Sequence, residues 1–289
     1  MASMREIKRR RGSIQSTQQI TKAMKLVATV KLQKARQRAE YSKPYFQYMY
    51  QTVSSVLAKA GAIDHPYLTK GKSDKVGIVV ITSDRGLAGG YNSNVVKLVT
   101  ESGFEKENVR LYTAGKKGAD ALSRKGYEVA VNLTDVMEEP TFADAKKLSE
   151  QLLADFKNGE IGEIYVAYTE FKNTVVHIPK LVKVLPVDTA SVGNDSSEAK
   201  KDDLAIMKFE PSEEETIGLL VPKYVASILY GTFVEAVASE NGARMQAMDS
   251  ATNNAEEIIN ELELVYNRAR QGAITQELTE IIAGADAIG

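Results

Sequence analysis

Proline is absent from both ends of this chain. The first 43 residues and the last 67 contain none, although the 289 residues include seven prolines. Proline breaks or kinks the interior of a helix, so each end is free to run as one long helix. At about 1.5 Å per residue these helices would reach roughly 65 Å and 100 Å, beyond the diameter of a small domain. We expect neither to be an ordinary core helix.

Cysteine is absent altogether, which excludes disulfides, thiolate metal sites and a cysteine nucleophile. Histidine is scarce, and His65 and His177 lack the neighbouring ligands of a metal site. Carboxylates form no local acid/base signature, and no apolar run approaches the roughly 18 residues that span a bilayer. We therefore expect no catalytic residue, no cofactor, no metal and no direct membrane insertion.

The C-terminal stretch carries an apolar seam. Its members alternate by three and four positions, the spacing that keeps one stripe of a helix facing a partner helix. They are Met245, Met248, Thr252, Ala255, Ile259, Leu262, Tyr266, Ala269 and Ala273. This helix therefore requires a partner helix.

Charge indicates which helix that partner is. Residues 1–40 carry eleven Lys or Arg against two acids, a net charge of +9, whereas residues 205–289 carry five bases against fourteen acids, a net charge of −9. Opposite fields favour pairing of the two ends, although salt screens them. Because the intervening residues leave the chain room to turn back, we expect an intramolecular antiparallel coiled coil.

Strand and helix patterns alternate between the two ends. Four runs read as strands, at 76–82, 109–113, 128–131 and 163–169. Three stretches read as helices, at 92–100, 118–124 and 142–156. Such alternation is typical of a mostly parallel sheet covered by helices.

The remaining segments complete the fold. Residues 174–178 and 181–185 are predicted to form an edge hairpin or extended pair, and the polar residues 188–203 a linker. Pro211 suits the start of the next helix. The predicted class is α/β, with a long antiparallel coiled coil formed by the N- and C-terminal helices plus a central Rossmann-like α/β domain. Its parts are an N-terminal coiled-coil helix (1–60), the central domain with its linker (61–204) and a C-terminal coiled-coil helix (205–289).

Two features favour binding functions. The loop Gly86–Gly90 follows a strand and opens a helix, where doubly wound folds hold phosphate, but it lacks the dinucleotide fingerprint and reads better as a tight turn. The basic run Lys8–Arg11 could contact nucleic-acid phosphates, although no aromatic residue interleaves before Tyr41 and the acidic C-terminal stretch competes for it. A nucleic-acid-binding coiled coil and a nucleotide-binding enzyme therefore stand as alternatives.

The C-terminal tip is apolar and carries few charges. Its apolar residues are Ile274, Leu278, Ile281, Ile282, Ala283, Ala285, Ala287 and Ile288. The basic partner helix cannot easily follow so far, and an exposed apolar tip aggregates unless another protein covers it. The tip therefore predicts a partner with an apolar socket.

Three segments resemble one family. Ile274–Ala287 closely resembles the signature of the γ subunits of F-type ATP synthases. Ile14–Ala28 looks like the opening helix of these subunits, and Thr82–Asn92 looks like their central strand–turn–helix. Together the three segments span the chain.

The resemblance implies a noncatalytic rotor shaft. The coiled coil would turn inside the ring of α and β subunits, and the central domain would lie near the membrane ring of c subunits. The ε subunit would be a further partner. Its rotation would couple transmembrane proton flow to ATP synthesis or hydrolysis. The absence of a cysteine-bearing insertion and of a visible targeting segment favours a bacterial complex, peripheral on the cytoplasmic side of the cell membrane.

The resemblance also implies partner-contact residues. Met24 and Lys25 would face the acidic lever segments of the catalytic subunits. Three positions of the C-terminal helix would touch inner loops of those subunits: Arg244, Gln271 and Thr275. The tip would turn in an apolar bearing through Leu278, Ile281 and Ile282. No contact with nucleic acid is implied.

Overall fold

The computed structural model describes residues 4–59, 65–187 and 212–288. They form two compact units. The terminal unit comprises the described residues up to Thr29 and those from Arg244 onward, and the sheet unit comprises those from Val30 to Ala243. Two long helices, α1 (Met4–Lys59) and α6 (Glu213–Ile288), contribute to both units. The predicted linker and Pro211 lie outside the described residues.

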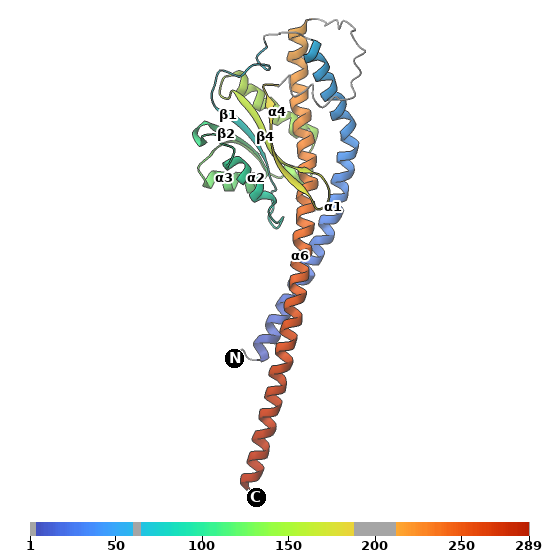
Figure 1. Cartoon of the computed structure of the whole chain (residues 1–289), viewed down its shortest axis with the longest axis vertical. Helices are drawn as coiled ribbons and strands as arrows, with labels where there is room; N and C mark the ends of the chain where they lie inside the picture. Colours follow the sequence, from blue (N-terminus) through green and yellow to red (C-terminus); the bar gives the residue numbers. More distant parts are fainter. Residues whose placement is uncertain (1–3, 60–64, 188–211, 289) are drawn as a thin grey trace. The chain divides into compact units, whose positions relative to one another are not determined.

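The sheet unit contains a five-stranded sheet in the order β3-β2-β1-β4-β5 (Figure 1). Its strands are β1 (Val76–Ile81), β2 (Val109–Ala114), β3 (Glu128–Leu133), β4 (Glu163–Phe171) and β5 (His177–Leu185). The first four are parallel, and β5 runs antiparallel to β4. The predicted mostly parallel sheet is therefore confirmed.

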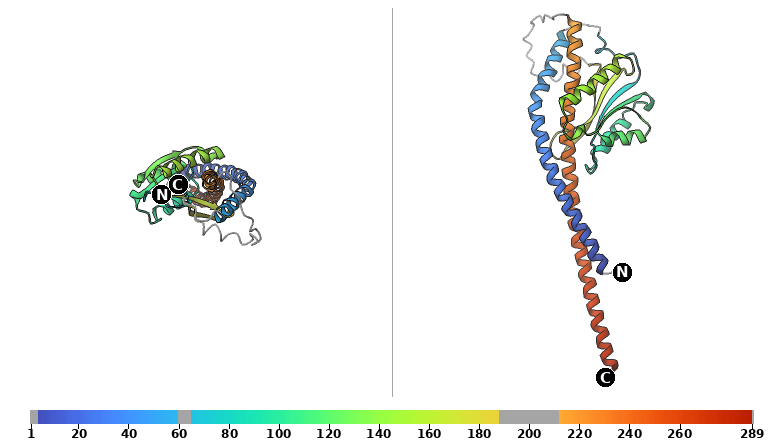
Figure 2. Two further views of the ribbon diagram at one scale, coloured as in Figure 1. Left: turned by 90° about the horizontal axis from the view of Figure 1, so that it is seen from above. Right: turned by 180° about the vertical axis from the view of Figure 1, so that it is seen from behind.

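Helices cover both faces of this sheet, as Figure 2 shows from a second side. The covering helices are α2 (Tyr91–Thr100), α3 (Lys116–Arg124) and α4 (Phe142–Lys157), with short 3-10 turns η1 (Lys106–Asn108) and η2 (Val136–Glu138). Side chains alternate along each strand, so neighbouring residues face opposite ways. Leu111 joins the apolar cluster with α2 and α3, whereas Tyr112 donates a 2.5 Å hydrogen bond to Asp155 of α4. The sheet is thus buried between two helical layers.

The predicted edge position of residues 174–185 is confirmed, but the predicted pairing of 174–178 with 181–185 is wrong. The structure has one strand there, β5, and its hairpin partner is β4. The turn lies at Asn173, whose side-chain oxygen accepts hydrogen bonds from the backbone N–H groups of Val175 and Val176 at 2.9 and 2.8 Å. Pro179 is tolerated inside β5 because an edge strand needs ladder donors on one side only.

Both long helices continue through a proline, Pro44 in α1 and Pro222 in α6. Both helices are therefore longer than the proline-free stretches predicted: α1 contains 56 residues and α6 contains 76. At the start of α6 the Ser212 hydroxyl accepts a hydrogen bond from the N–H of Glu215 at 3.2 Å, a typical N-cap. The acidic first turn, Glu213–Glu215, suits the positive end of the helix dipole.

One helix has the length and composition of a membrane span. Within α6, between Glu213 and Asp286, a window of 18 residues has a mean hydropathy of 1.5, and 56% of that window is buried inside the structure. Because this hydropathy is a mean over the window, it does not require the uninterrupted apolar run that the sequence lacks. Burial of this kind is also typical of a core helix.

Candidate functional surface

In the terminal unit, α6 packs against α1 along the predicted seam (Figure 1). Met248 and Ala255 are each only 5% exposed. From Ala255 to Ala269 every seam position is buried or half-buried, and every position between them faces solvent. The seam prediction is confirmed as far as Ala269 and wrong at Ala273, which is exposed.

α1 supplies a matching stripe. Apart from Met24, its buried or half-buried positions up to Ala28 recur at alternating intervals of four and three: Ile7, Arg11, Ile14, Gln18, Thr21, Lys25 and Ala28. A sustained seven-residue repeat of this kind is the pattern of a left-handed coiled coil. Two of the stripe positions carry a cation, so the seam contains charges that need partners.

Polar pairs across the seam fix the register of the two helices. The distances are 2.5 Å between Lys25 Nζ and Asp249 Oδ1, 2.8 Å between the hydroxyls of Thr21 and Thr252, and 3.5 Å between Arg11 and Glu263. Each step toward the start of α1 is matched by a step toward the end of α6, so the helices are antiparallel. The predicted coiled coil is confirmed, with α1 bases meeting α6 acids.

α6 extends past the part of α1 that pairs with it. Arg11 lies opposite Glu263, and the seven described residues before Arg11 amount to about two helical turns. Every residue from Gln271 to Asp286 is exposed. This stretch, which we call the tip, therefore has no helix partner within the described chain.

The large apolar side chains of the tip share one face. Ile274, Leu278, Ile281 and Ile282 are between 50% and 62% exposed. Their spacing of i, i+4, i+7 and i+8 places them on one side of a helix, instead of all around it. The tip therefore presents an apolar stripe in one direction and polar or small residues in the others.

The remaining predicted contact residues differ in their surroundings. Met24 is half-buried beside the seam, and Lys25 is bonded to Asp249. Arg244 is half-buried and already interacts within the chain. Gln271 and Thr275 face solvent, and the carbonyl of Thr275 accepts a hydrogen bond from the Thr279 hydroxyl at 2.8 Å.

Sequence reasoning missed an apolar patch on α1. Ile20, Leu26 and Val27 are 60%, 62% and 58% exposed and lie on either side of Met24. Ile20 and Val27 are seven residues apart, so they lie on the same side of the helix. The signal was present in the sequence, because these large apolar residues fall outside the seam repeat of α1.

The loop Gly86–Gly90 forms a tight turn. Leu87 and Gly89 both have positive φ angles, 63° and 56°. The turn is closed by the side chain of Asn92, whose oxygen accepts a hydrogen bond from the N–H of Ser83 at 2.9 Å. The geometry matches the interpretation of this loop as a turn between β1 and α2.

α6 occupies the position where doubly wound sheets bind ligands, the carboxyl edge between the strands at which the strand order reverses. In this sheet those strands are β1 and β4. The Tyr91 hydroxyl donates to the carbonyl of Ala236 at 3.2 Å, and the Ser239 hydroxyl donates to the carbonyl of Thr169 at 3.0 Å. Ala236 and Ser239 are fully buried, so α6 fills this position.

The described residues contain no group of three or more histidine or acidic side chains that could hold a metal ion. Burial lowers the pKa of His177, and burial, partly offset by Glu214, lowers the pKa of His65. Both imidazoles are therefore neutral near pH 7 and belong to the packing of the sheet unit.

Comparisons with known sequences give consistent matches. A family model described as ATP synthase matches residues 3–288. The ATP synthase gamma chain of Lachnoclostridium phytofermentans is 59% identical to this chain, and the alignment covers 100% of both. The sodium ion specific ATP synthase gamma chain of Acetobacterium woodii is 41% identical, with 99% of both chains covered.

Solved structures agree with these matches. A chain in the central stalk and c-ring of the mitochondrial ATP synthase of Tetrahymena thermophila has a TM-score of 0.61 and 25% identity, covering 80% of this chain and 99% of that one. A chain in the rotor of the Euglena gracilis mitochondrial enzyme has a TM-score of 0.69 at 17% identity, covering 94% and 98%, which shows the fold alone. These matches do not support the nucleic-acid-binding alternative.

Proposed function

This chain belongs to the ATP synthase gamma-chain family and is a central rotor shaft, and we propose that the α6 tip and the α1 patch carry its coupling to the catalytic subunits. The rotor couples ion flow across the membrane to ATP synthesis or hydrolysis. Its partners are the α and β subunits of the catalytic ring, the ε subunit and the ring of c subunits.

The observation that carries this proposal is the exposed apolar face of the tip. Four large apolar side chains stand in solvent on a segment that no described part of the chain covers. Contiguous exposed apolar surface marks a protein contact. A socket formed by the α and β subunits would cover the stripe, with Leu278, Ile281 and Ile282 as its contacts.

The one-sided chemistry of the tip supports a role in coupling. A ligand or partner shifts an equilibrium only as far as its contacts differ between the states. Because the stripe faces one direction, the subunit that meets it changes as the shaft turns. Each angle of the shaft then favours a different set of states at the three nucleotide sites.

A second contact zone lies on the coiled coil. Ile20 and Val27 of the apolar patch flank Met24 at i−4 and i+3, Leu26 lies on a neighbouring side of the helix, and all of them stand among the bases of α1. The bases of such a surface suit the acidic lever segments of the catalytic subunits. Lys25 acts here mainly through the register of the coil, because it is bonded to Asp249. Arg244, Gln271 and Thr275 would meet inner loops of the ring.

The chain itself performs no chemistry in this proposal. The position where an α/β sheet would hold a nucleotide is filled by Ala236 and Ser239 of α6, which supports a mechanical role. We divide the chain into the shaft helices at 1–60 and 205–289 and the central domain at 61–204. The complex is membrane-associated, and we place this chain on the cytoplasmic side of a bacterial membrane.

Site-directed photocrosslinking tests the proposal, because the chain has no native cysteine to interfere. A benzophenone maleimide attached to Leu278→Cys is expected to label α or β subunits after co-assembly. The same reagent on Lys172→Cys, an exposed position in the turn between β4 and β5, serves as the control and is expected to leave them unlabelled. A complex that assembles without labelling at position 278 would contradict the socket.

A further inference from the structure

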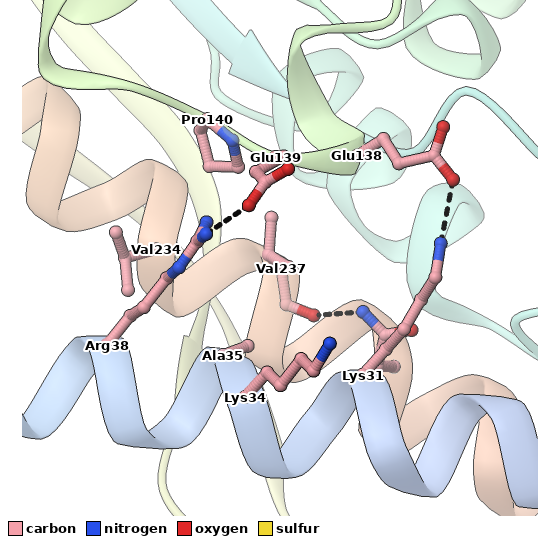
Figure 3. A pocket seen from close by; sticks show the side chains of 10 residues that line it. Lys31, Lys34, Ala35, Arg38, Glu138, Glu139, Pro140, Val234 and Val237 are labelled. Carbon is pink, nitrogen blue, oxygen red and sulfur yellow. Dashed lines mark hydrogen bonds and ion pairs between the residues drawn. The ribbon is translucent and has the colours of Figure 1, made fainter.

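A cavity of about 320 Å³ lies in the sheet unit, between α1, the segment that joins η2 to α4, and α6 (Figure 3). Its volume is at the lower end of the roughly 300–1,000 Å³ that ligand pockets occupy. None of the residues that line the cavity belongs to the tip or to the α1 patch.

Three cations of α1 line one wall of this cavity, and only one of them lacks a partner. Lys31 donates to Glu138 at 2.7 Å, and Arg38 donates to Glu139. Lys34 lies between these two ion pairs (Figure 3) and makes no hydrogen bond or ion pair with any described residue. The lining therefore has a net charge of +1, and the unpaired charge is on Lys34.

The opposite wall contains a buried polar atom without a partner. Asn241 of α6 is only 4% exposed. Its Nδ2 donates to the carbonyl of Val237 at 2.8 Å, which identifies the other amide atom as the oxygen. That oxygen, Oδ1, is buried and accepts no hydrogen bond from the described residues. A buried acceptor in this condition is destabilising, so it favours a ligand that brings a donor.

Apolar surface lies between these two polar groups. Ala35, Pro140, Val234 and Val237 complete the lining. Small-molecule sites commonly combine such apolar walls with a few polar groups that fix the orientation of the ligand. The cavity has this combination, with one cation and one acceptor from different helices.

We propose that this cavity binds a small organic monoanion that carries a hydroxyl or amine donor. Its anionic group pairs with Lys34, its donor meets Asn241 Oδ1, and its apolar body contacts Val234 and Val237. Glu138 and Glu139 are already paired with Lys31 and Arg38, so the lining carries one net positive charge, which matches a monoanion better than a dianion. The ligand would bridge α1 and α6 within the sheet unit.

Three matched probes test this chemistry with the full chain in isothermal titration. 4-Hydroxyphenylacetate has the charge, the apolar ring and the donor, phenylacetate lacks the donor, and 4-hydroxyphenylacetamide lacks the charge. We expect saturable binding of the first probe and affinities roughly tenfold or more weaker for the other two, as for the loss of one buried or charged hydrogen bond.

Variants locate the binding. Lys34→Gln and Asn241→Leu are each expected to weaken 4-hydroxyphenylacetate binding about tenfold or more. Lys172→Gln, which removes one exposed charge elsewhere in the sheet unit, is expected to leave it unchanged. Lys34 is exposed, so its variant remains informative if Asn241→Leu does not fold. Absence of saturable binding, or equal affinity in Lys34→Gln and the parent chain, would overturn the proposal and leave the rotor function untouched.

Discussion

Lys25 Nζ lies 2.5 Å from Asp249 Oδ1, across the seam between α1 and α6. Both side chains keep substantial exposure, 39% and 47%, so solvent weakens the attraction between them. Its main consequence is specificity, because a shifted or parallel pairing would leave a cation on the seam without an acid. The pair therefore contributes more to selecting one register of the coiled coil than to the stability of the coiled coil.

Exchanging the two charges tests this role. Lys25→Asp alone places two acids across the seam and is expected to destabilise the chain, whereas Lys25→Asp with Asp249→Lys restores an attractive pair. The coupling free energy should be about 0.2–1 kcal/mol, as for other exposed pairs. Urea unfolding of the parent, both single variants and the double variant measures it. Strictly additive effects would show that the two side chains do not interact.

Two glycines with positive φ angles separate backbone strain from steric overlap. Gly115 has φ 102°, and an added Cβ would lie 2.0 Å from the carbonyl oxygen of Thr82. Gly103 has φ 82° with open space around it. We expect Gly103→Ala to cost about 1–2 kcal/mol of unfolding free energy from strain alone. Gly115→Ala should cost more than about 4 kcal/mol, because backbone must move as well.

Denaturant unfolding of the two alanine variants makes this comparison directly. The sheet unit of Gly115→Ala is expected to unfold at a much lower urea concentration than that of Gly103→Ala, or to fail to fold. Similar midpoints for the two variants would mean that the close approach of Gly115 to Thr82 is absent in solution.

The two histidines predict a pH dependence. Burial lowers the pKa of His177 and, partly offset by Glu214, that of His65. A histidine whose pKa is lower in the folded state binds protons more readily when unfolded. Its contribution to stability is therefore complete above the unfolded pKa of about 6.5 and falls as the pH drops toward the folded pKa.

Replacing both histidines by glutamine should remove this loss. The parent chain is expected to lose stability between about pH 7.5 and about pH 5.5, above the range where ordinary carboxylates titrate. The double variant His65→Gln/His177→Gln is expected to lose less over the same interval, measured by urea unfolding at both pH values. Equal losses in the two proteins would assign the pH dependence to other groups.

The direction of the apolar stripe can be tested with matched pairs of substitutions. Leu278→Gln/Ile282→Gln changes the apolar face of the tip, and Thr279→Gln/Ala283→Gln introduces the same two residues at the same spacing elsewhere on the helix. All four positions are exposed, so unfolding free energies should change by no more than about 0.5 kcal/mol. We expect the first pair to weaken assembly with α and β subunits at least about tenfold more than the second. Equal effects would contradict a one-sided stripe.

The seam and the strands could be predicted from sequence because each is a local pattern. The repeat through Ala255 and Ala269 follows from its period, and the buried strand β1 follows from a continuous apolar run. Ala273 continues the repeat but is exposed, because the register places it beyond the start of α1. The sequence of α6 alone does not indicate where the partner helix α1 begins, so the end of the paired region could not be predicted from it.

Features that depend on distant segments were not predicted. The continuous strand β5 results from its pairing with β4 and from the turn at Asn173, while its β-branched clusters suggested two strands. The cavity beside Lys34 requires α1, the η2–α4 segment and Asn241 of α6 to meet, and these are far apart in the sequence. A sequence pattern within one segment does not indicate which distant segments that segment contacts.

Rotation of a single assembled complex is the most direct test of the shaft. The catalytic ring of α and β subunits is immobilised, this chain is assembled into it, and a bead is attached through Lys172→Cys. With ATP present we expect the bead to turn in one direction, in steps of a third of a turn. Failure to co-assemble, or ATP hydrolysis by an assembled complex whose bead does not turn, would contradict the rotor function.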